Sequence, residues 1–188
     1  MFKKVIFLSV LISFLACNSS LSTKEIENYT VKGKEITEAS FLELSNNLMT
    51  QMKMGGPSQA ISFCNLQAIP ITNQLSEKYN VTIKRTSDKI RNLDNKSTQR
   101  ELQLIDNYKN EIAKNAELKP IVEVDDAKKI HFYAPIIVQA KCLTCHGKLN
   151  ETVNVQTDSI LKSLYPNDKA FGYEEGDLRG IWSITFKN

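Results

Sequence analysis

The chain has 188 residues, enough for one domain with its own core, and 41% of them are hydrophobic while 24% are charged. Its 24 Lys and Arg barely exceed its 21 Asp and Glu, which gives a formal net charge of +3. This balance excludes the basic footprint of a nucleic-acid-binding protein. The sequence also shows no internal repeat and no low-complexity block.

The first 16 residues have the pattern of a signal peptide. Two lysines precede an apolar run from Val5 to Ala16, which is too short to span a bilayer about 30 Å thick. The run ends in Phe-Leu-Ala-Cys, similar to a lipobox, although Phe14 and Leu15 depart from the usual residues. We therefore expect Cys17 to be lipidated and the protein to be exported, anchored by lipid to a bacterial membrane and facing the periplasm or the cell exterior. Simple secretion after a cut at Ala16 is the alternative.

The segment after the signal peptide predicts a linker and then one folded domain. Asn18 to about Asn28 is rich in Ser, Thr and Asn, which is typical of a flexible tether. We assign residues 17–34 to the lipidated cysteine with its tether. Residues 35–188 are assigned to a single domain.

Two helices open the predicted domain. Apolar residues recur at helical spacing from Ile36 to about Met54, and Gly55-Gly56 should end this first helix before Pro57 begins the second. Cys64 lies on the apolar stripe of the second helix, which Pro70 should kink.

The middle of the chain predicts a strand and a further helix. Val81 to Thr86 alternates as a strand does, and it places Arg85 on an otherwise apolar face, where an arginine is a candidate partner for a buried acid. Arg91 follows in a polar loop. A helix from about Ser97 to Lys114 begins with a capping box at Thr98.

The last third of the chain predicts an antiparallel sheet. Pro120–Val124 and Lys129–Val138 have the pattern of a hairpin, Asp158 to about Leu164 that of a short helix, and Ile181–Phe186 that of a terminal strand. Helices first and antiparallel strands afterwards define the α+β class.

The motif with the clearest chemistry follows the hairpin. Cys142-Leu143-Thr144-Cys145-His146 is the C-x-x-C-H signature of covalent haem c attachment, in which two thiols join the porphyrin and the imidazole binds iron. A redox-active cysteine pair and half of a zinc site are the alternatives. A four-ligand zinc site needs a second Cys or His pair, which the sequence does not offer.

The second iron ligand is less defined by the sequence. Cys64 has no partner once Cys17 and the motif are assigned, so it is either a small buried core residue or the ligand opposite His146. His131 shares a strand face with Tyr133 and is predicted to be a surface or structural residue. Three methionines also remain as candidate ligands, since Met/His is a common haem c pair: Met49, Met52 and Met54.

Several blocks of sequence together resemble a known family. They span about residues 41–186 and keep one order: Lys84–Ser87 with Arg91-Asn92, Tyr133–Ile136 before the motif, Leu164–Pro166, Gly172-Tyr173 and Gly176–Gly180. These blocks are similar to the PAS-like haem c domains of the Tll-type haem c proteins, long catalogued as a domain of unknown function. Leu93 departs from the proline that this family usually shows after Arg-Asn.

The resemblance implies a PAS-like antiparallel sheet with an N-terminal helical part and helices flanking one covalent haem c. It also implies His146 as the proximal axial ligand and Cys64 as the distal one. We assign propionate contacts to Arg85 and Arg91 and a contact with the haem edge to Tyr133. Arg179 is assigned a structural role.

The leading functional hypothesis is a membrane-anchored c-type cytochrome domain for redox or gas sensing or for low-potential one-electron transfer. It would act with a redox partner protein rather than as an enzyme, and a homodimer remains open. The alternatives are a haem-dependent enzyme such as a peroxidase, and an exported lipoprotein without haem.

Overall fold

A computed structural model describes residues 21–187 of the chain. The predicted signal peptide and the predicted lipidation site at Cys17 lie outside these residues. Among the helices of residues 21–187, none is both long and apolar enough to cross a membrane.

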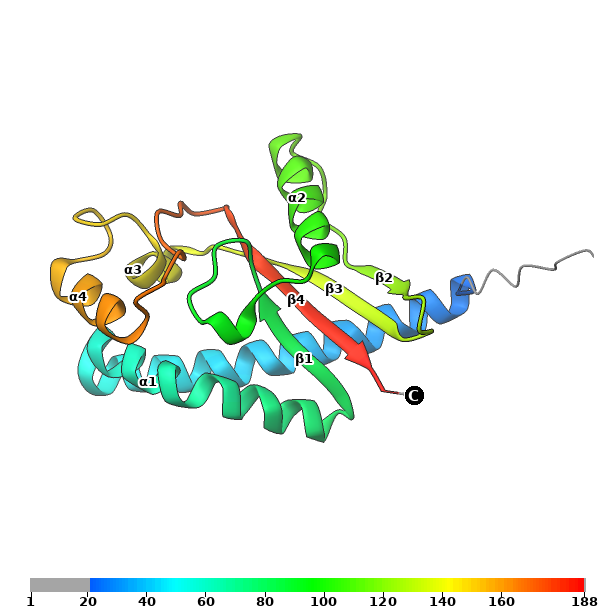
Figure 1. The fold of residues 1–188 in the computed structure, drawn as a ribbon, viewed down its shortest axis with the longest axis horizontal. Helices are drawn as coiled ribbons and strands as arrows, with labels where there is room; N and C mark the ends of the chain where they lie inside the picture. The colour runs from blue at the N-terminus through cyan, green and yellow to red at the C-terminus, as the bar shows by residue number, and fades with distance from the viewer. Residues whose placement is uncertain (1–20, 188) are drawn as a thin grey trace, which may run out of the picture.

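Helix α1, Thr23–Lys78, is a helical hairpin. It begins with a capping box between Ser22 and Glu25, and its backbone leaves helical geometry only at Gly55 and Gly56. The positive φ of Gly56, 67°, is a conformation that glycine adopts without steric cost. Figure 1 shows the chain reversing here, so that the two arms of α1 run back alongside each other. The break predicted at the two glycines is confirmed.

Two expectations for this region need correction. Residues 23–34 were assigned to a flexible tether, but they form the first turns of α1, because the capping box starts the helix ahead of Thr23. Pro70 was expected to kink the second arm, yet Pro70 lies inside α1 and only Gly55 and Gly56 have non-helical angles there.

A four-stranded antiparallel sheet forms the centre of the fold. Its strands are β1 (Val81–Thr86), β2 (Ile121–Val124), β3 (Ile130–Ile137) and β4 (Leu178–Phe186), in the order β1-β4-β3-β2. The C-terminal strand therefore lies between β1 and β3, with Arg85 opposite Trp182 and Ala134 opposite Trp182 on the other side. The predicted α+β class with an antiparallel sheet is confirmed.

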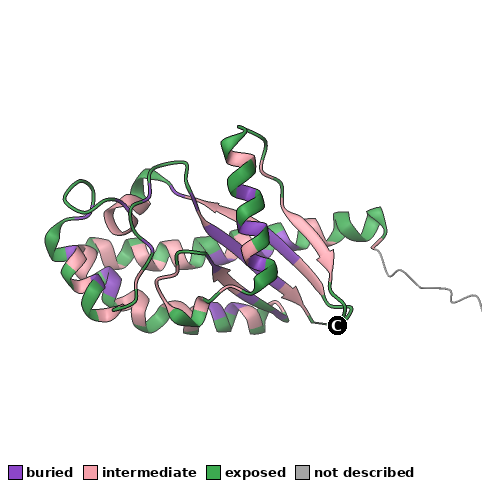
Figure 2. Ribbon diagram, turned by 45° about the horizontal axis from the view of Figure 1, so that its top comes forward, coloured by how far each residue is buried: buried purple, intermediate pink, exposed green. Residues whose placement is uncertain are grey.

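Helices cover both faces of the sheet. Helix α1 packs on one face, against a core of Ile36, Leu75, Val81, Ile83, Phe132, Trp182 and Ile184. Helix α2, Gln99–Ala113, packs on the other face, against a core of Leu104, Ile105, Tyr108, Tyr133, Leu178 and Ile181. Figure 2 shows the buried residues concentrated on the strands between these helices.

Short elements gather at the end of the sheet where α1 reverses (Figure 1). They are the 3-10 turns η1 (Leu93–Asn95) and η2 (Ala140–Cys142) and the helices α3 (Leu143–His146) and α4 (Val155–Leu164). This end of the molecule carries the C-x-x-C-H motif.

Gly33 offers a test of the packing between α1 and the sheet. A Cβ atom at Gly33 would overlap the ring of the fully buried Phe132. Alanine is favoured over glycine in a helix by about 1 kcal/mol, but overpacking a core costs about 1–3 kcal/mol. We expect Gly33→Ala to lower the free energy of unfolding by about 1 kcal/mol, measured by denaturant titration.

Asn73→Ala, at an exposed position of the same helix, is the control and should be neutral or stabilising. In a Phe132→Leu background, the penalty of Gly33→Ala should shrink. An equal penalty in both backgrounds would show that the Phe132 ring is not what excludes a side chain at Gly33.

Candidate functional site

The C-x-x-C-H motif forms one tight turn directly after β3. Cys142 ends η2, and Cys145 and His146 lie in α3, so one helical turn presents both thiols and the imidazole. The turn is closed by the Gly147 N–H, which donates to the Leu143 carbonyl at 2.9 Å. The backbone N–H of Gln139 contacts the Cys142 sulfur at 3.4 Å. The three motif side chains are all partly buried.

The imidazole of His146 is fixed by one hydrogen bond. Its Nδ1 lies 2.7 Å from the carbonyl oxygen of Ala170. A carbonyl oxygen only accepts, so Nδ1 carries the proton and Nε2 keeps a free lone pair, which is the arrangement of a metal-binding histidine. Burial and the nearby Arg179 and Arg91 cations hold the pKa of His146 well below its usual range. The ring is therefore neutral at neutral pH and ready to act as a ligand.

Residues 168–173, called the strap below, hold the motif in place through hydrogen bonds. The N–H of Gly172 donates to the Gly147 carbonyl at 2.8 Å, and that of Tyr173 to the His146 carbonyl at 3.0 Å. Together with the Ala170 carbonyl on the imidazole, these bonds fix both the backbone and the side chain of His146 from one segment.

Arg91 ties this strap to the motif from a third segment. Its Nε donates to Asp168 Oδ2 at 2.9 Å, and its Nη2 donates to the carbonyls of Cys145 at 2.6 Å and Ala170 at 3.1 Å. The ion pair is well shielded, with 13% of the Arg91 side chain and 8% of the Asp168 side chain exposed. The sequence placed Arg91 in a polar loop, and the structure makes it part of the motif's support.

Cys64 belongs to the same group of residues. It lies on the second arm of α1, and burial raises the pKa of its thiol, while the positive charges of Arg85 and Arg91 act in the opposite direction. Burial also raises the pKa of Cys145, with Cys64 among the neighbouring groups that contribute. The thiols of Cys64 and Cys145 therefore influence each other electrostatically, although they are 81 positions apart in the sequence.

Arginines are concentrated around the motif. Arg85 lies with its guanidinium 5.8 Å from the Trp182 ring centre, and Arg179 lies 5.5 Å from that of Tyr173. Desolvation lowers the pKa of both arginines, and each also feels another arginine. Among the described residues, Asp168 is the carboxylate that pairs with an arginine of this group. The site therefore has more positive than negative charge.

A β-bulge explains how Arg179 enters the site. Ile136 pairs with Gly180 and Ile137 with Leu178, so Arg179 is an extra residue without a partner on β3. Bulges re-aim side chains and are frequent beside functional sites. Gly180 is needed there because a Cβ atom would overlap the carbonyl oxygen of Thr86 on β1. The structural role predicted for Arg179 is only part of its placement: its Nη1 donates to the Lys89 carbonyl at 3.2 Å, and its guanidinium lies by the Tyr173 ring that meets His146.

Tyr173 completes the wall beside His146. Its ring meets the imidazole edge to face at 6.3 Å, and the Lys89 ammonium lies 4.9 Å from its centre. The Tyr173 hydroxyl is buried on the side of the Arg179 guanidinium, and among residues 21–187 it makes no hydrogen bond of full geometry. An unpaired buried hydroxyl is costly, so it marks a place where a further polar group would be stabilised.

The other candidate residues lie elsewhere. Tyr133 is 4% exposed and packs in the core under α2, on the opposite sheet face from Trp182 and Arg85. His131 lies at the other end of β3, and its two ring nitrogens are 3.0 Å from Asp125 Oδ2 and from Thr185 Oγ1. Met49 and Met54 are 41% and 71% exposed. None of these residues joins the described group around His146.

Four residues that surround His146 were not predicted from the sequence to contribute to the site: Asp168, Ala170, Tyr173 and Arg179. Ala170 acts through its backbone, which no side-chain pattern reveals. Asp168, Tyr173 and Arg179 fall within or beside the sequence blocks that carried the family resemblance, and that was the available signal.

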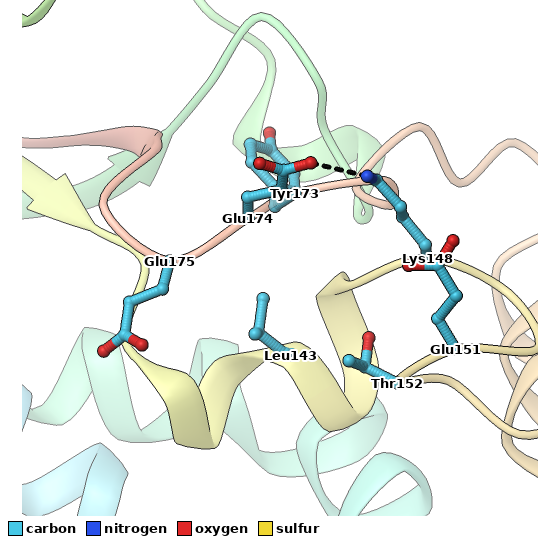
Figure 3. A pocket seen from close by; sticks show the side chains of 7 residues that line it. All are labelled: Leu143, Lys148, Glu151, Thr152, Tyr173, Glu174 and Glu175. Atoms are coloured by element: carbon cyan, nitrogen blue, oxygen red, sulfur yellow. Dashed lines mark hydrogen bonds and ion pairs between the residues drawn. The ribbon is translucent and has the colours of Figure 1, made fainter.

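Two clefts lie near the motif, one reaching the segment before it and one lined by Leu143. An apolar groove of about 360 Å³ lies between α1 and the end of β3, lined among others by Phe41, Phe132 and Trp182, and it reaches Gln139 beside Cys142. A smaller cleft of about 170 Å³ lies on the outer side of the motif, between Leu143 and Tyr173 (Figure 3). Its rim is charged and carries the ion pair between Lys148 and Glu174.

Comparisons with known proteins agree with this architecture. The sequence model of the Tll0287-like family matches residues 18–187. Among solved structures, the chain is similar to the crystal structure of the cyanobacterial heme-protein Tll0287, with a TM-score of 0.57 and 23% sequence identity, over 89% of this chain and 98% of that chain. No curated protein matches the chain.

The chain therefore belongs to the Tll0287-like family, and the resemblance inferred from its sequence blocks is confirmed. The shared fold also confirms the predicted PAS-like α+β architecture.

The neutral state of His146 predicts a pH dependence of the haem-free chain. Its pKa is lowered in the folded state, so acidification protonates the unfolded chain first, and folding stability falls as the pH drops below about 6.5. One such group changes the free energy of unfolding by at most about 1.4 kcal/mol per pH unit. Denaturant titrations at pH 7.5, 6.5 and 5.5 should show this loss in the wild type, and a smaller loss in His146→Gln.

Asn73→Ala, which removes no titratable group, is the control and should keep the wild-type pH slope. An unchanged slope in His146→Gln would show that burial of His146 does not govern this range of pH.

Proposed function

We propose that this protein binds one haem c, attached through Cys142 and Cys145 with His146 as the proximal iron ligand. The hydrogen bond from His146 Nδ1 to the Ala170 carbonyl carries this proposal, since it leaves Nε2 free in a neutral, oriented imidazole. The C-x-x-C-H spacing supports covalent attachment. The description of the similar solved protein as a heme-protein agrees with it.

The surroundings of the motif fit a large apolar ring that carries two carboxylates. The groove that reaches Gln139, three residues before Cys142, offers aromatic side chains for contact with a porphyrin. Arg85 and Arg179 are candidates for the two propionates, because the site has positive charge in excess and arginine binds carboxylates in a bidentate manner. Arg91 could contribute only its Nη1, since its Nε and Nη2 donate to protein groups.

Cys64 is the proposed distal ligand. It lies on the arm of α1 that packs near the motif, and its thiol shares an electrostatic environment with Cys145. Its raised pKa means that the free thiol keeps its proton at neutral pH, so ligation as a thiolate would release that proton. The guanidiniums of Arg85 and Arg91 favour that loss.

A haem c with two protein ligands supplies one-electron chemistry, and a thiolate ligand favours a low reduction potential. We therefore propose redox or gas sensing or low-potential electron transfer with a protein partner, rather than turnover of a substrate. Two protein ligands would occupy both axial positions, which disfavours a peroxidase. The signal-peptide and lipobox patterns support export and a lipid anchor at Cys17.

The site is tested by absorption spectra of the full chain coexpressed with haem-attachment machinery. We expect the wild type to show a low-spin spectrum whose haem stays bound after denaturation. Cys64→Ala should convert the oxidised protein to high spin, because it removes one axial ligand. Met52→Ala, a change of the alternative ligand on the same helix, should leave the spectrum unchanged.

A double variant, Cys142→Ala with Cys145→Ala, should lose covalent haem. A spectrum that changes in Met52→Ala but not in Cys64→Ala would reverse the assignment of the distal ligand. A wild-type chain without a Soret band would refute haem binding itself.

The anchor is tested separately by cell fractionation. Cys17→Ser should move the protein from the membrane fraction to the soluble exported fraction, because acylation requires the thiol. Cys64→Ser, which removes a thiol away from the lipidation site, is the control and should remain in the membrane fraction. Release of both variants, or of neither, would contradict lipidation at Cys17.

A further inference from the structure

The carbonyl of Ala170 serves two donors at once. His146 Nδ1 donates to it at 2.7 Å, and the Arg91 Nη2 group donates to it at 3.1 Å. A carbonyl oxygen has two lone pairs, so both bonds can form together. The cation on one side weakens the electrostatic pull that the oxygen exerts on the histidine proton. How strongly His146 is polarised therefore depends on Arg91.

Asp168 binds both Arg91 and the backbone of Ala170. Its Oδ2 accepts from Arg91 Nε at 2.9 Å, and its Oδ1 accepts from the backbone N–H of Ala170 at 2.7 Å. Asp168, Arg91 and the Ala170 peptide thus form a closed ring of hydrogen bonds. Because Arg91 also donates to the Cys145 carbonyl, this ring is joined to the motif at two points, the Cys145 carbonyl and the His146 side chain.

We propose that Arg91 and Asp168 are positioning residues that orient His146 through the Ala170 carbonyl and set the redox balance of the site. This inference rests on the proposed function. It gives Arg91 a role other than the propionate contact expected from the sequence, since two of its three nitrogens already donate to protein groups.

The two residues have opposite effects in this arrangement. When the Arg91 charge is lost, only His146 donates to the Ala170 carbonyl, so the imidazole becomes a stronger electron donor as an iron ligand. The same change removes a cation from the site. Both changes favour oxidised iron. Loss of the Asp168 charge leaves Arg91 uncompensated, which favours the reduced form. A purely structural loosening would instead admit water in both variants and shift them in the same direction.

The experiment is a redox titration of the haem-loaded full chain with Arg91→Gln, Asp168→Asn and Arg91→Lys. At the wild-type midpoint potential, we expect the ratio of oxidised to reduced protein to rise about tenfold in Arg91→Gln and to fall about tenfold in Asp168→Asn. Arg91→Lys keeps the charge and should shift the ratio far less than Arg91→Gln. Asparagine keeps an oxygen that can accept from Ala170, so Asp168→Asn preserves the fold of the strap.

The ion pair between Arg100 and Glu123 supplies matched controls. Arg100 also donates through Nε to a carboxylate, but across α2 and β2, outside the ring of hydrogen bonds at His146. Arg100→Gln and Glu123→Gln should leave the midpoint near that of the wild type.

Shifts of the same sign in Arg91→Gln and Asp168→Asn, or shifts no larger than those of the controls, would overturn the inference while leaving haem binding intact. If Arg91→Gln takes up no haem, the directions in Asp168→Asn and Arg91→Lys decide. A wild-type chain without haem would instead overturn the proposed function, and the inference with it.

Discussion

The functional end of this molecule depends on one hydrogen bond, from His146 Nδ1 to the carbonyl of Ala170. The bond fixes the tautomer, directs the ring and exposes the other nitrogen for a metal. It holds because the acceptor is itself held: Asp168 binds the Ala170 N–H, and Arg91 bridges Asp168, the same carbonyl and the motif. A flexible acceptor would leave the imidazole free to rotate, and a five-residue motif cannot supply this constraint alone.

The rest of the fold brings distant segments to this bond. The reversal of α1 at Gly55-Gly56 returns its second arm along the sheet, so that Cys64 comes near a motif far along the chain. The placement of β4 between β1 and β3 puts Arg85 and Trp182 opposite each other, and the bulge in β4 turns Arg179 toward His146. The placements of Arg85 and Arg179 concentrate positive charge in a partly buried place, which costs desolvation energy unless an anion shares the site.

Elements defined by local patterns of residues follow the sequence predictions, and features that depend on long-range packing depart from them. The strands, the glycine break and the capping box at Thr98 were predicted within a few residues, because periodicity and caps involve neighbouring positions. The start of α1 was wrong, since a Ser/Thr/Asn-rich stretch suggested a tether while the Ser22–Glu25 capping box and the close packing of Gly33 on Phe132 favour a helix. Tyr133 was assigned to the haem edge, yet strand alternation places it under α2.

The sequence by itself determined the chemistry that one turn of chain can hold, two thiols and an imidazole at fixed spacing, together with the class of fold and the family. Only the tertiary structure decided which groups surround that turn. The Ala170 carbonyl, the Asp168–Arg91 ion pair and the bulged Arg179 reach it through backbone bonds and strand register. Such contacts join residues far apart in the chain, and their selection depends on how whole elements pack, which no local pattern of residue types encodes.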